Sequence, residues 1–425
     1  MKIILWIFIS IATLAAYKNI QAIEPTIREP IIKEELPLDI EMEKINAIIY
    51  LNELRSATGL VRLNESTLLN QSANNHAKYL LSHKITTHNE EKGREHFTGE
   101  TVGERAKHIG YKAFYVSENI SGGSRNYKES IDGLFSAIYH RFGFLDFKVD
   151  EVGIGIVQDN KNKSETTFVF NMGISTLNQL CNGQSFSQLG KYIQGACFDK
   201  DFKISEQLFN YSFQINHKLN TDIAIYPYDG EVDVPPAFFK ETPDPLPDYD
   251  VSGFPISISF DDEQFESLTL ESFRLFDKNH QEIKDRLIYD YKSDINHMFK
   301  KYEFALFPLE RLEWESQYSV EVAYRVDGVK KSKKWSFSTR KFSEKIESVT
   351  EKNNLFTLKR GVSSIFYFKP TSPHDLLSEI TFPTYVDIGL IDENTIRLVV
   401  LEDAPSRIDL NIDGHELHLN IKNSD

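Results

Sequence analysis

Cysteine is scarce in this sequence of 425 residues, which contains only Cys181 and Cys197. The two lie too far apart for a CxxC motif, and no histidine stands between them, so a metal-binding or redox pair is not expected. In an exported chain, they are predicted to form a disulfide that closes a loop of ~15 residues and contributes about 3 kcal/mol to stability.

Basic residues are outnumbered, because 48 lysines and arginines stand against 63 aspartates and glutamates, which gives a formal net charge of -15. This balance disfavours nucleic acid and anionic membranes as partners. Hydrophobic residues make up 40% of the chain and aromatic residues 12%, which indicates packed cores instead of disorder. The length corresponds to about three domains.

Long apolar runs are also absent, except at the N-terminus. Residues 1–22, MKIILWIFISIATLAAYKNIQA, contain a lysine, an apolar run from Ile3 to Ala16 and a short polar stretch that ends in Ala22. The run is too short to span a bilayer, and this order of regions is typical of a cleavable signal peptide, with a retained N-terminal anchor as the alternative. We therefore expect a secreted chain, periplasmic or at the cell surface, with no transmembrane segment after signal cleavage.

The spacing of apolar residues predicts an α+β domain over residues 41–178. Helices are expected to begin at four places: near Glu41, after Asn64 or Ser66, at Thr101 and at Asn126. The last two starts fit capping boxes, because a glutamate follows each by three residues. The helix that begins at Thr101 should end near Gly110.

Two histidines stand on these helices at different kinds of position. His76 lies on the apolar face of the second helix, so we expect it to point inward as a packing residue. The fourth helix is predicted to carry the second histidine, His140, at its C-terminal end, within Tyr139-His140-Arg141.

Beyond the fourth helix the apolar period changes to two in EVGIGI and TTFVFNMGI, which predicts a hairpin. Helices that flank a small antiparallel sheet make an α+β fold.

The rest of the chain is predicted to be rich in β-structure. Residues 179–219 are interpreted as a linker closed by the disulfide, and residues 220–345 contain short alternating runs that favour a β-sandwich. Residues 346–425 form a further β-rich region with an Asp413-Gly414 hairpin turn. The pattern leaves open whether this last region is an independent domain.

Motifs of common enzyme classes are missing. There is no HExxH zinc motif, no GxSxG nucleophile elbow and no phosphate-binding glycine loop. No catalytic residue is predicted, and a function without turnover is favoured over an enzyme. Histidines are concentrated instead in one stretch of the first domain, NNHAKYLLSHKITTHNEEKGREHFTGETVGERAKHIGY.

A series of ordered motifs then resembles a known family. The series is HAKYLLSH, ITTH, GERAKHIGY, SENISGG, YHRFGFLD and EVGIGI. It is similar to the CAP superfamily (cysteine-rich secretory, antigen 5, pathogenesis-related 1), in its bacterial branch, over roughly residues 45–175. The resemblance implies an α-β-α sandwich whose cleft holds two histidines and acidic residues and, in some members, a divalent metal. Residues 220–345 more faintly resemble the immunoglobulin-like modules of bacterial surface proteins.

The resemblance also implies the residues of the cleft. Its two histidines correspond to His88 and His140, and its first glutamate corresponds to Glu118. The second glutamate would fall near Ala137 and is therefore absent. His88 and His140 are the candidate metal ligands, and with Glu118 they could form a His₂Glu set with an open water position, which suits zinc. A polar cleft without metal is the alternative.

The sequence leaves three functions open. The favoured one is a secreted protein whose His/Glu cleft binds an extracellular ligand, namely a lipid, a glycan or a divalent metal, without turnover. The second is a metal-dependent hydrolase of peptide or cell-wall material, although no free general base is identifiable. The third is an adhesion or scaffold protein that acts through its β-rich half.

Overall fold

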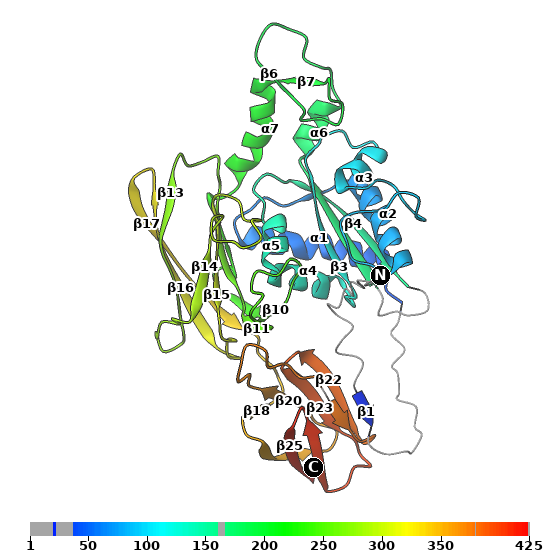
Figure 1. Ribbon diagram of the computed structural model, residues 1–425, viewed down its shortest axis with the longest axis vertical. Coiled ribbons are helices and arrows are strands. Elements are labelled where there is room, and N and C mark those ends of the chain that lie inside the picture. Colours follow the sequence, from blue (N-terminus) through cyan, green and yellow to red (C-terminus); the bar gives the residue numbers. More distant parts are fainter. Residues whose placement is uncertain (1–19, 23–36, 160–165, 379, 424–425) are drawn as a thin grey trace, which may run out of the picture.

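The computed structural model describes residues 20–22, 37–159, 166–378 and 380–423, which fold into three units (Figure 1). The predicted signal peptide therefore lies mostly outside the described residues. Only its last three residues are described, as strand β1 (Ile20–Ala22), which pairs in parallel with β21 (Ile380–Phe382) of the third unit. The turn predicted in the first hairpin falls on residues 160–165 and also lies outside them.

The first unit contains a four-stranded sheet with the order β2-β4-β5-β3. Its strands are β2 (Asn64–Glu65), β3 (Val116–Gly122), β4 (Glu151–Gln158) and β5 (Thr166–Gly173). Its helices are α1 (Ile40–Ala57), α2 (Thr67–His83), α3 (Val102–His108), α4 (Tyr127–Ser136) and α5 (Ile138–Phe144). The first unit is thus a mixed α and β structure, as the sequence predicted.

Helices pack on both faces of this sheet. On one face α2 lies so close that a Cβ at Gly153 or Gly155 would come within 2.2 Å of its backbone, so these two glycines set the distance between helix and sheet. On the other face Leu51 of α1 and Phe135 of α4 share a hydrophobic core with Ile154 and its neighbours. The alternating glycines of EVGIGI thus mark the face covered by α2.

The predicted helix starts at Thr101 and Asn126 are confirmed. Thr101 Oγ1 accepts a hydrogen bond from the backbone N–H of Glu104, and Asn126 Oδ1 accepts one from that of Glu129. The expectation that the last helix runs on to His140 is wrong, because Ala137 has an extended conformation (φ -76°, ψ 112°) and separates α4 from α5. The free N–H of Ile138 is satisfied from outside the helix, which allows the break.

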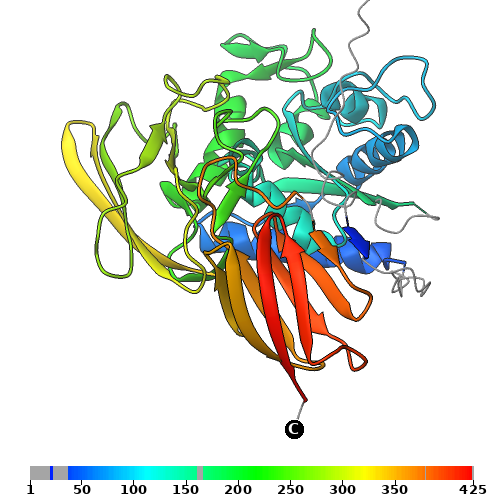
Figure 2. The same cartoon turned by 60° about the horizontal axis from the view of Figure 1, so that its bottom comes forward.

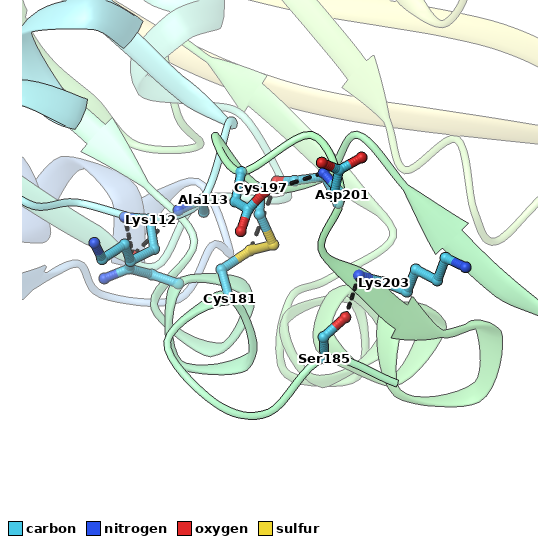
Figure 3. The surroundings of a disulfide bond; sticks show 10 residues. Lys112, Ala113, Cys181, Ser185, Cys197, Asp201 and Lys203 are labelled. Carbon is cyan, nitrogen blue, oxygen red and sulfur yellow. Dashed lines mark hydrogen bonds between the residues drawn. A yellow bond between two sulfur atoms is a disulfide. The ribbon is translucent and has the colours of Figure 1, made fainter. Parts of the chain in front are cut away.

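Residues 179–219, expected to be a linker, contain regular structure. They include helix α7 (Glu206–Leu219), the end of α6 (Ser175–Cys181) and a hairpin of β6 (Tyr192–Gln194) and β7 (Lys203–Ser205). The predicted disulfide between Cys181 and Cys197 is present, with Cα atoms 5.6 Å apart (Figure 3). The disulfide fastens the segment around Cys197 to the end of α6, and backbone hydrogen bonds join residues 196–198 to residues 112–114, which lead into β3.

The second unit consists of two four-stranded sheets and a small hairpin, with the sheet orders β14-β15-β12-β8 and β13-β16-β17-β9. The strands are β8 (Ile223–Tyr226), β9 (Glu231–Val234), β10 (Ala237–Phe239), β11 (Val251–Gly253), β12 (Ile256–Phe260), β13 (Leu268–Phe276), β14 (Arg286–Tyr289), β15 (Glu303–Pro308), β16 (Gln317–Val326) and β17 (Val329–Thr339). Phe260 and Tyr324 join the two sheets with ring centroids 4.9 Å apart.

The first two units share one hydrophobic core. The ring of Phe135 on α4 lies 4.8 Å from that of Tyr226 on β8, and the same cluster of buried residues runs from α1 to β17. The guanidinium of Arg141 on α5 is fully buried and lies over the rings of Tyr226 and Phe254. These two units therefore pack as one body.

The third unit has a separate hydrophobic cluster, made only of residues between Val349 and Ile421 with flanking apolar side chains. Its strands are β18 (Ile346–Val349), β19 (Asn353–Lys359), β20 (Ser363–Phe368), β21, β22 (Val386–Asp392), β23 (Thr395–Val400), β24 (Arg407–Ile412) and β25 (His415–Lys422). The unit lies beneath the other two in Figure 1 and comes forward in Figure 2.

Within the described ranges, no helix combines the length and the apolar character that crossing a membrane requires.

Candidate functional site

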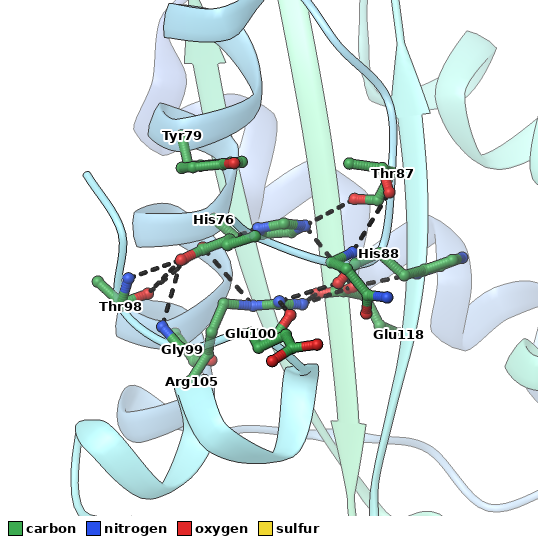
Figure 4. A network of polar contacts seen from close by, with 12 residues as sticks. His76, Tyr79, Thr87, His88, Thr98, Gly99, Glu100, Arg105 and Glu118 are labelled. Atoms are coloured by element: carbon green, nitrogen blue, oxygen red, sulfur yellow. Dashed lines mark hydrogen bonds and ion pairs between the residues drawn. The ribbon is translucent and has the colours of Figure 1, made fainter. Parts of the chain in front are cut away.

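Glu118 stands on β3, opposite Asn171 of β5, and its side chain is only 2% exposed. Both of its oxygens accept hydrogen bonds from the Arg105 guanidinium at 2.8 Å, and one also accepts from His88 Nδ1 at 3.1 Å (Figure 4). Burial alone would raise the pKa of Glu118, but the hydrogen bond from His88 and the charge of Arg105 hold it below its ordinary value. Glu118 is therefore an ionised carboxylate whose two oxygens are both occupied.

Arg105 on α3 is the cation at the centre of this cluster, and it is fully buried. Besides Glu118, it donates to the backbone carbonyl oxygens of His88, at 2.9 Å, and Glu100, at 3.3 Å. One arginine thus fixes both the glutamate and the loop that carries His88. Sequence reasoning missed this residue, since an arginine within GERAKHIGY has no local feature that distinguishes it from a solvent-exposed one.

The buried pair of His76 and Glu90 belongs to the same network, in which Figure 4 labels His76 beside Arg105 and Glu118. His76 is buried as predicted, but it makes polar contacts: Nδ1 lies 2.9 Å from Glu90 Oε1, and Nε2 lies 3.0 Å from the carbonyl oxygen of Thr87. Because both ring nitrogens face acceptors, only the doubly protonated ring satisfies both contacts. In this cluster His76 and Arg105 contact two carboxylates, Glu90 and Glu118.

The two predicted cleft histidines come together although they stand on separate elements. His88 lies in the loop between α2 and α3 and is 56% exposed, while His140 lies on α5 and is 18% exposed. Their rings stack with centroids 6.4 Å apart and planes 25° apart. Asn119, next to Glu118 on β3, donates to the carbonyl oxygen of His140 at 2.8 Å, so the strand also positions α5.

A further carboxylate reaches the site from the second unit. Glu241, in the segment between β10 and β11, has Oε2 3.3 Å from His140 Nδ1, and its Oε1 accepts from the N–H of Ile138 at 2.8 Å. Burial raises the pKa of this carboxyl, and the contact with His140 offsets the rise only in part. Sequence reasoning missed Glu241, because it lies 101 residues beyond His140 in a stretch rich in proline and aspartate.

The two imidazoles are held in the same way. The Nδ1 of His88 and that of His140 each face a carboxylate, which can only accept, so each Nδ1 carries a proton. The Nε2 atoms of these two rings have no hydrogen-bond partner within the described part of the chain. In its neutral form each ring therefore presents an Nε2 lone pair that can accept a hydrogen bond or coordinate a cation.

The fit to a divalent metal is partial. Across residues 20–22, 37–159, 166–378 and 380–423, no three histidine, cysteine, aspartate or glutamate side chains are arranged to hold a metal ion. Glu118 is occupied by Arg105, so the predicted His₂Glu set is not assembled. A metal would instead be held by Nε2 of His88 and of His140, with Glu118 and Glu241 as the carboxylates that orient the two rings. Zinc binding stays a prediction.

One family model matches part of the chain. Residues 48–172 match the model of the CAP family, described as the cysteine-rich secretory protein family. No curated protein matches the chain. Among solved structures, it is similar to an outer surface protein from Borrelia burgdorferi at 17% identity and a TM-score of 0.29, over 32% of this chain and 96% of that one.

Two other solved structures share less of their own length with this chain. An extracellular protein containing an SCP domain from Bacillus anthracis is 19% identical with a TM-score of 0.27, over 31% of this chain and 40% of that one. A cysteine-rich secretory protein from Staphylococcus aureus is 20% identical with a TM-score of 0.24, over 32% of this chain and 40% of that one. This chain thus spans less than half the length of either protein.

Proposed function

Because residues 48–172 form a CAP domain, we propose that this chain is an extracellular protein whose cleft binds a ligand between His88 and His140 without turning it over. The two β-rich units, the first of them an immunoglobulin-like sandwich, display and support that cleft. The disulfide between Cys181 and Cys197 supports an oxidising location outside the cytoplasm, and so does the signal-like pattern of residues 1–22.

The observation that carries the proposal is that both carboxylates of the cleft are already in use. Glu118 is bound on both oxygens by Arg105, and Glu241 bridges Ile138 and His140. A general base must reach the proton that it removes, and a carboxylate engaged on both oxygens is poorly placed to do so. This arrangement favours binding over hydrolysis.

The two imidazoles also limit the chemistry of the ligand. Two Nε2 lone pairs favour a ligand that offers hydrogen-bond donors, such as the hydroxyl groups of a glycan, or a divalent cation. A divalent cation bound there would act as a Lewis acid. A lipid chain offers neither hydrogen-bond donors nor a cation. The two imidazoles therefore do not favour a lipid chain as the group bound between them.

Isothermal titration calorimetry on the full chain tests the proposal, with zinc chloride and a set of soluble oligosaccharides as separate probes. We expect at least one probe to bind with a stoichiometry near one, and binding to be lost in the His88→Ala/His140→Ala variant. The matched control is His83→Ala/His108→Ala, which removes two histidines of the same domain that lie outside the pair. Unchanged binding in the first variant, or equal loss in both, contradicts the proposal.

A further inference from the structure

Helix α5, which carries His140, is attached to the second unit through three consecutive side chains. Tyr139 Oη donates to Asp294 Oδ1 at 2.6 Å, His140 Nδ1 faces Glu241, and Arg141 Nη1 donates to the carbonyl oxygen of Pro255 at 2.7 Å. Asp294, Glu241 and Pro255 all belong to the second unit. One cleft histidine is therefore presented by a helix whose side chains are built into an interface.

Glu241 is the only one of these partners with a contact to a cleft imidazole among the described residues. Its side chain is 4% exposed, and its two oxygens engage the same turn of α5, one at the N–H of Ile138 and one at His140 Nδ1. The carboxylate therefore satisfies a free N–H in the first turn of α5 and also selects the tautomer of the His140 imidazole. The residue acts through His140, and nothing places it against a ligand.

We propose that Glu241 is a positioning residue for the cleft and that the second unit thereby completes the ligand site of the CAP domain; this inference rests on the proposed function. By accepting from Nδ1–H, the carboxylate keeps Nε2 of neutral His140 free of a proton. The resemblance placed a second glutamate near Ala137, where the CAP domain has none, and Glu241 reaches Ile138 from outside the domain.

The third unit holds the other end of the segment that carries Glu241. Asp250, nine positions further on, forms ion pairs with Lys240 and with His374 Nδ1 of the third unit, the latter at 2.9 Å. The backbone N–H groups of Asp250 and Val251 both donate to the carbonyl oxygen of Pro373, at 2.8 and 3.0 Å. The segment that carries Glu241 is therefore contacted by both β-rich units, and an isolated CAP domain lacks these contacts.

The substitution Glu241→Gln separates positioning from packing. The amide oxygen of glutamine must face the N–H of Ile138, because two donors cannot pair, so the NH₂ group must face His140 Nδ1. Nδ1 then becomes an acceptor, and the proton of neutral His140 moves to Nε2. The change is nearly isosteric, yet it converts the ligand-facing nitrogen from an acceptor into a donor.

The test uses the full chain labelled with ¹⁵N-histidine at about pH 8, where an ordinary histidine with a pKa of about 6.5 is neutral. The His140 signal is identified by its loss in His140→Asn. Imidazole ¹⁵N shifts should show the Nδ1–H tautomer in the wild type and the Nε2–H tautomer in Glu241→Gln. Zinc affinity, used as the probe of the cleft, should fall about 10–100-fold, as for other residues that orient a ligand.

Two further variants define the outcome. Glu303→Gln replaces another buried glutamate of the second unit and should leave the His140 tautomer and the zinc affinity unchanged. Glu241→Asp keeps the carboxylate and should keep the wild-type tautomer of His140. This second variant also tests the inference if the Glu241→Gln chain fails to fold. An unchanged His140 tautomer in Glu241→Gln, or an affinity equal to that of the wild type, overturns the inference. A wild-type chain that binds neither zinc nor oligosaccharides overturns the proposed function instead, and the ligand-free tautomer still decides the role of Glu241.

Discussion

Arg105 donates to both carboxylate oxygens of Glu118 at 2.8 Å, and both side chains are buried. Such a pair is costly to break, because removing one partner leaves the other charge without compensation inside the protein. Because Arg105 also donates to the carbonyl oxygen of His88, the pair connects the stability of the first unit to the position of the loop that carries this histidine.

Arg105→Ala should destabilise the first unit by about 3–5 kcal/mol, because Glu118 loses its cation while Glu90 keeps only His76. Urea unfolding followed by far-UV circular dichroism measures the loss. The control is Arg325→Ala on β16, which removes a 47% exposed partner of Glu271 and should cost less than about 1 kcal/mol. Similar losses in the two variants would show that the buried pair has no special role.

Acid should weaken the first unit through Glu90 and Glu118. Both carboxyls have pKa values below the ordinary 4.5 in the folded protein. Burial would raise the two pKa values, but contacts with His76 and Thr98 outweigh it for Glu90. For Glu118 the contacts with His88 and Arg105 do the same. A depressed folded-state pKa stabilises the protein above the unfolded pKa, and this contribution is lost as pH falls through the folded value.

Stability measured by urea unfolding at fixed steps from pH 7 to pH 3 should therefore be constant near neutrality and fall below about pH 4.5. In Glu118→Gln the stability at pH 7 should be lower, and the decline toward pH 3 should be smaller than in the wild type. An equal decline in both proteins would assign the acid sensitivity to other carboxyls.

Glu303 on β15 should have the opposite pH dependence. Burial raises its pKa to about 7, with Lys300 opposing the shift. A carboxyl whose pKa is raised in the folded protein contributes to stability at pH values below its unfolded pKa of 4.5. This contribution is lost as the pH rises through about 7. Glu303→Gln should accordingly stabilise the chain by about 1–3 kcal/mol at pH 8 and have little effect at pH 5. Urea unfolding at the two pH values checks this, and a stabilisation that is equal at both pH values contradicts it.

Gly155 on β4 should tolerate no side chain. A Cβ there would lie 2.2 Å from the backbone of Ala73 in α2, which carries His76 three residues later, so the helix must move away from the sheet. Gly155→Ala should cost about 1–3 kcal/mol or more as an overpacked site and should weaken ligand binding. Gly133→Ala on α4, where no atom lies within 4 Å of the added Cβ, should be neutral or stabilising by up to about 1 kcal/mol. Thermal unfolding of both variants provides the comparison.

Much of the first unit could be predicted because its signals are local. A cap residue such as Thr101 or Asn126 acts within one turn, and the alternation in EVGIGI marks a strand whatever packs on it. The resemblance carried by the ordered motifs nominated His88, Glu118 and His140, and the structure places His88 close to each of the other two. The continuation of the helix through Ala137 was the failure, since the break depends on a partner from another unit.

The sequence by itself determined the helix starts, the strand pattern and the pairing of Cys181 with Cys197, because each of these depends on residues and spacing along the chain, while the resemblance to a family nominated His88, Glu118 and His140. Only the tertiary structure decided what the cleft residues do. It buried Arg105 against Glu118, gave His76 two acceptors, and brought Glu241 to His140. The contacts of Arg105 and His76 join residues 11 to 14 positions apart within the first unit, where the loop between α2 and α3 folds back on the sheet. The contact of Glu241 spans 101 positions and depends on the packing of two units around a shared core.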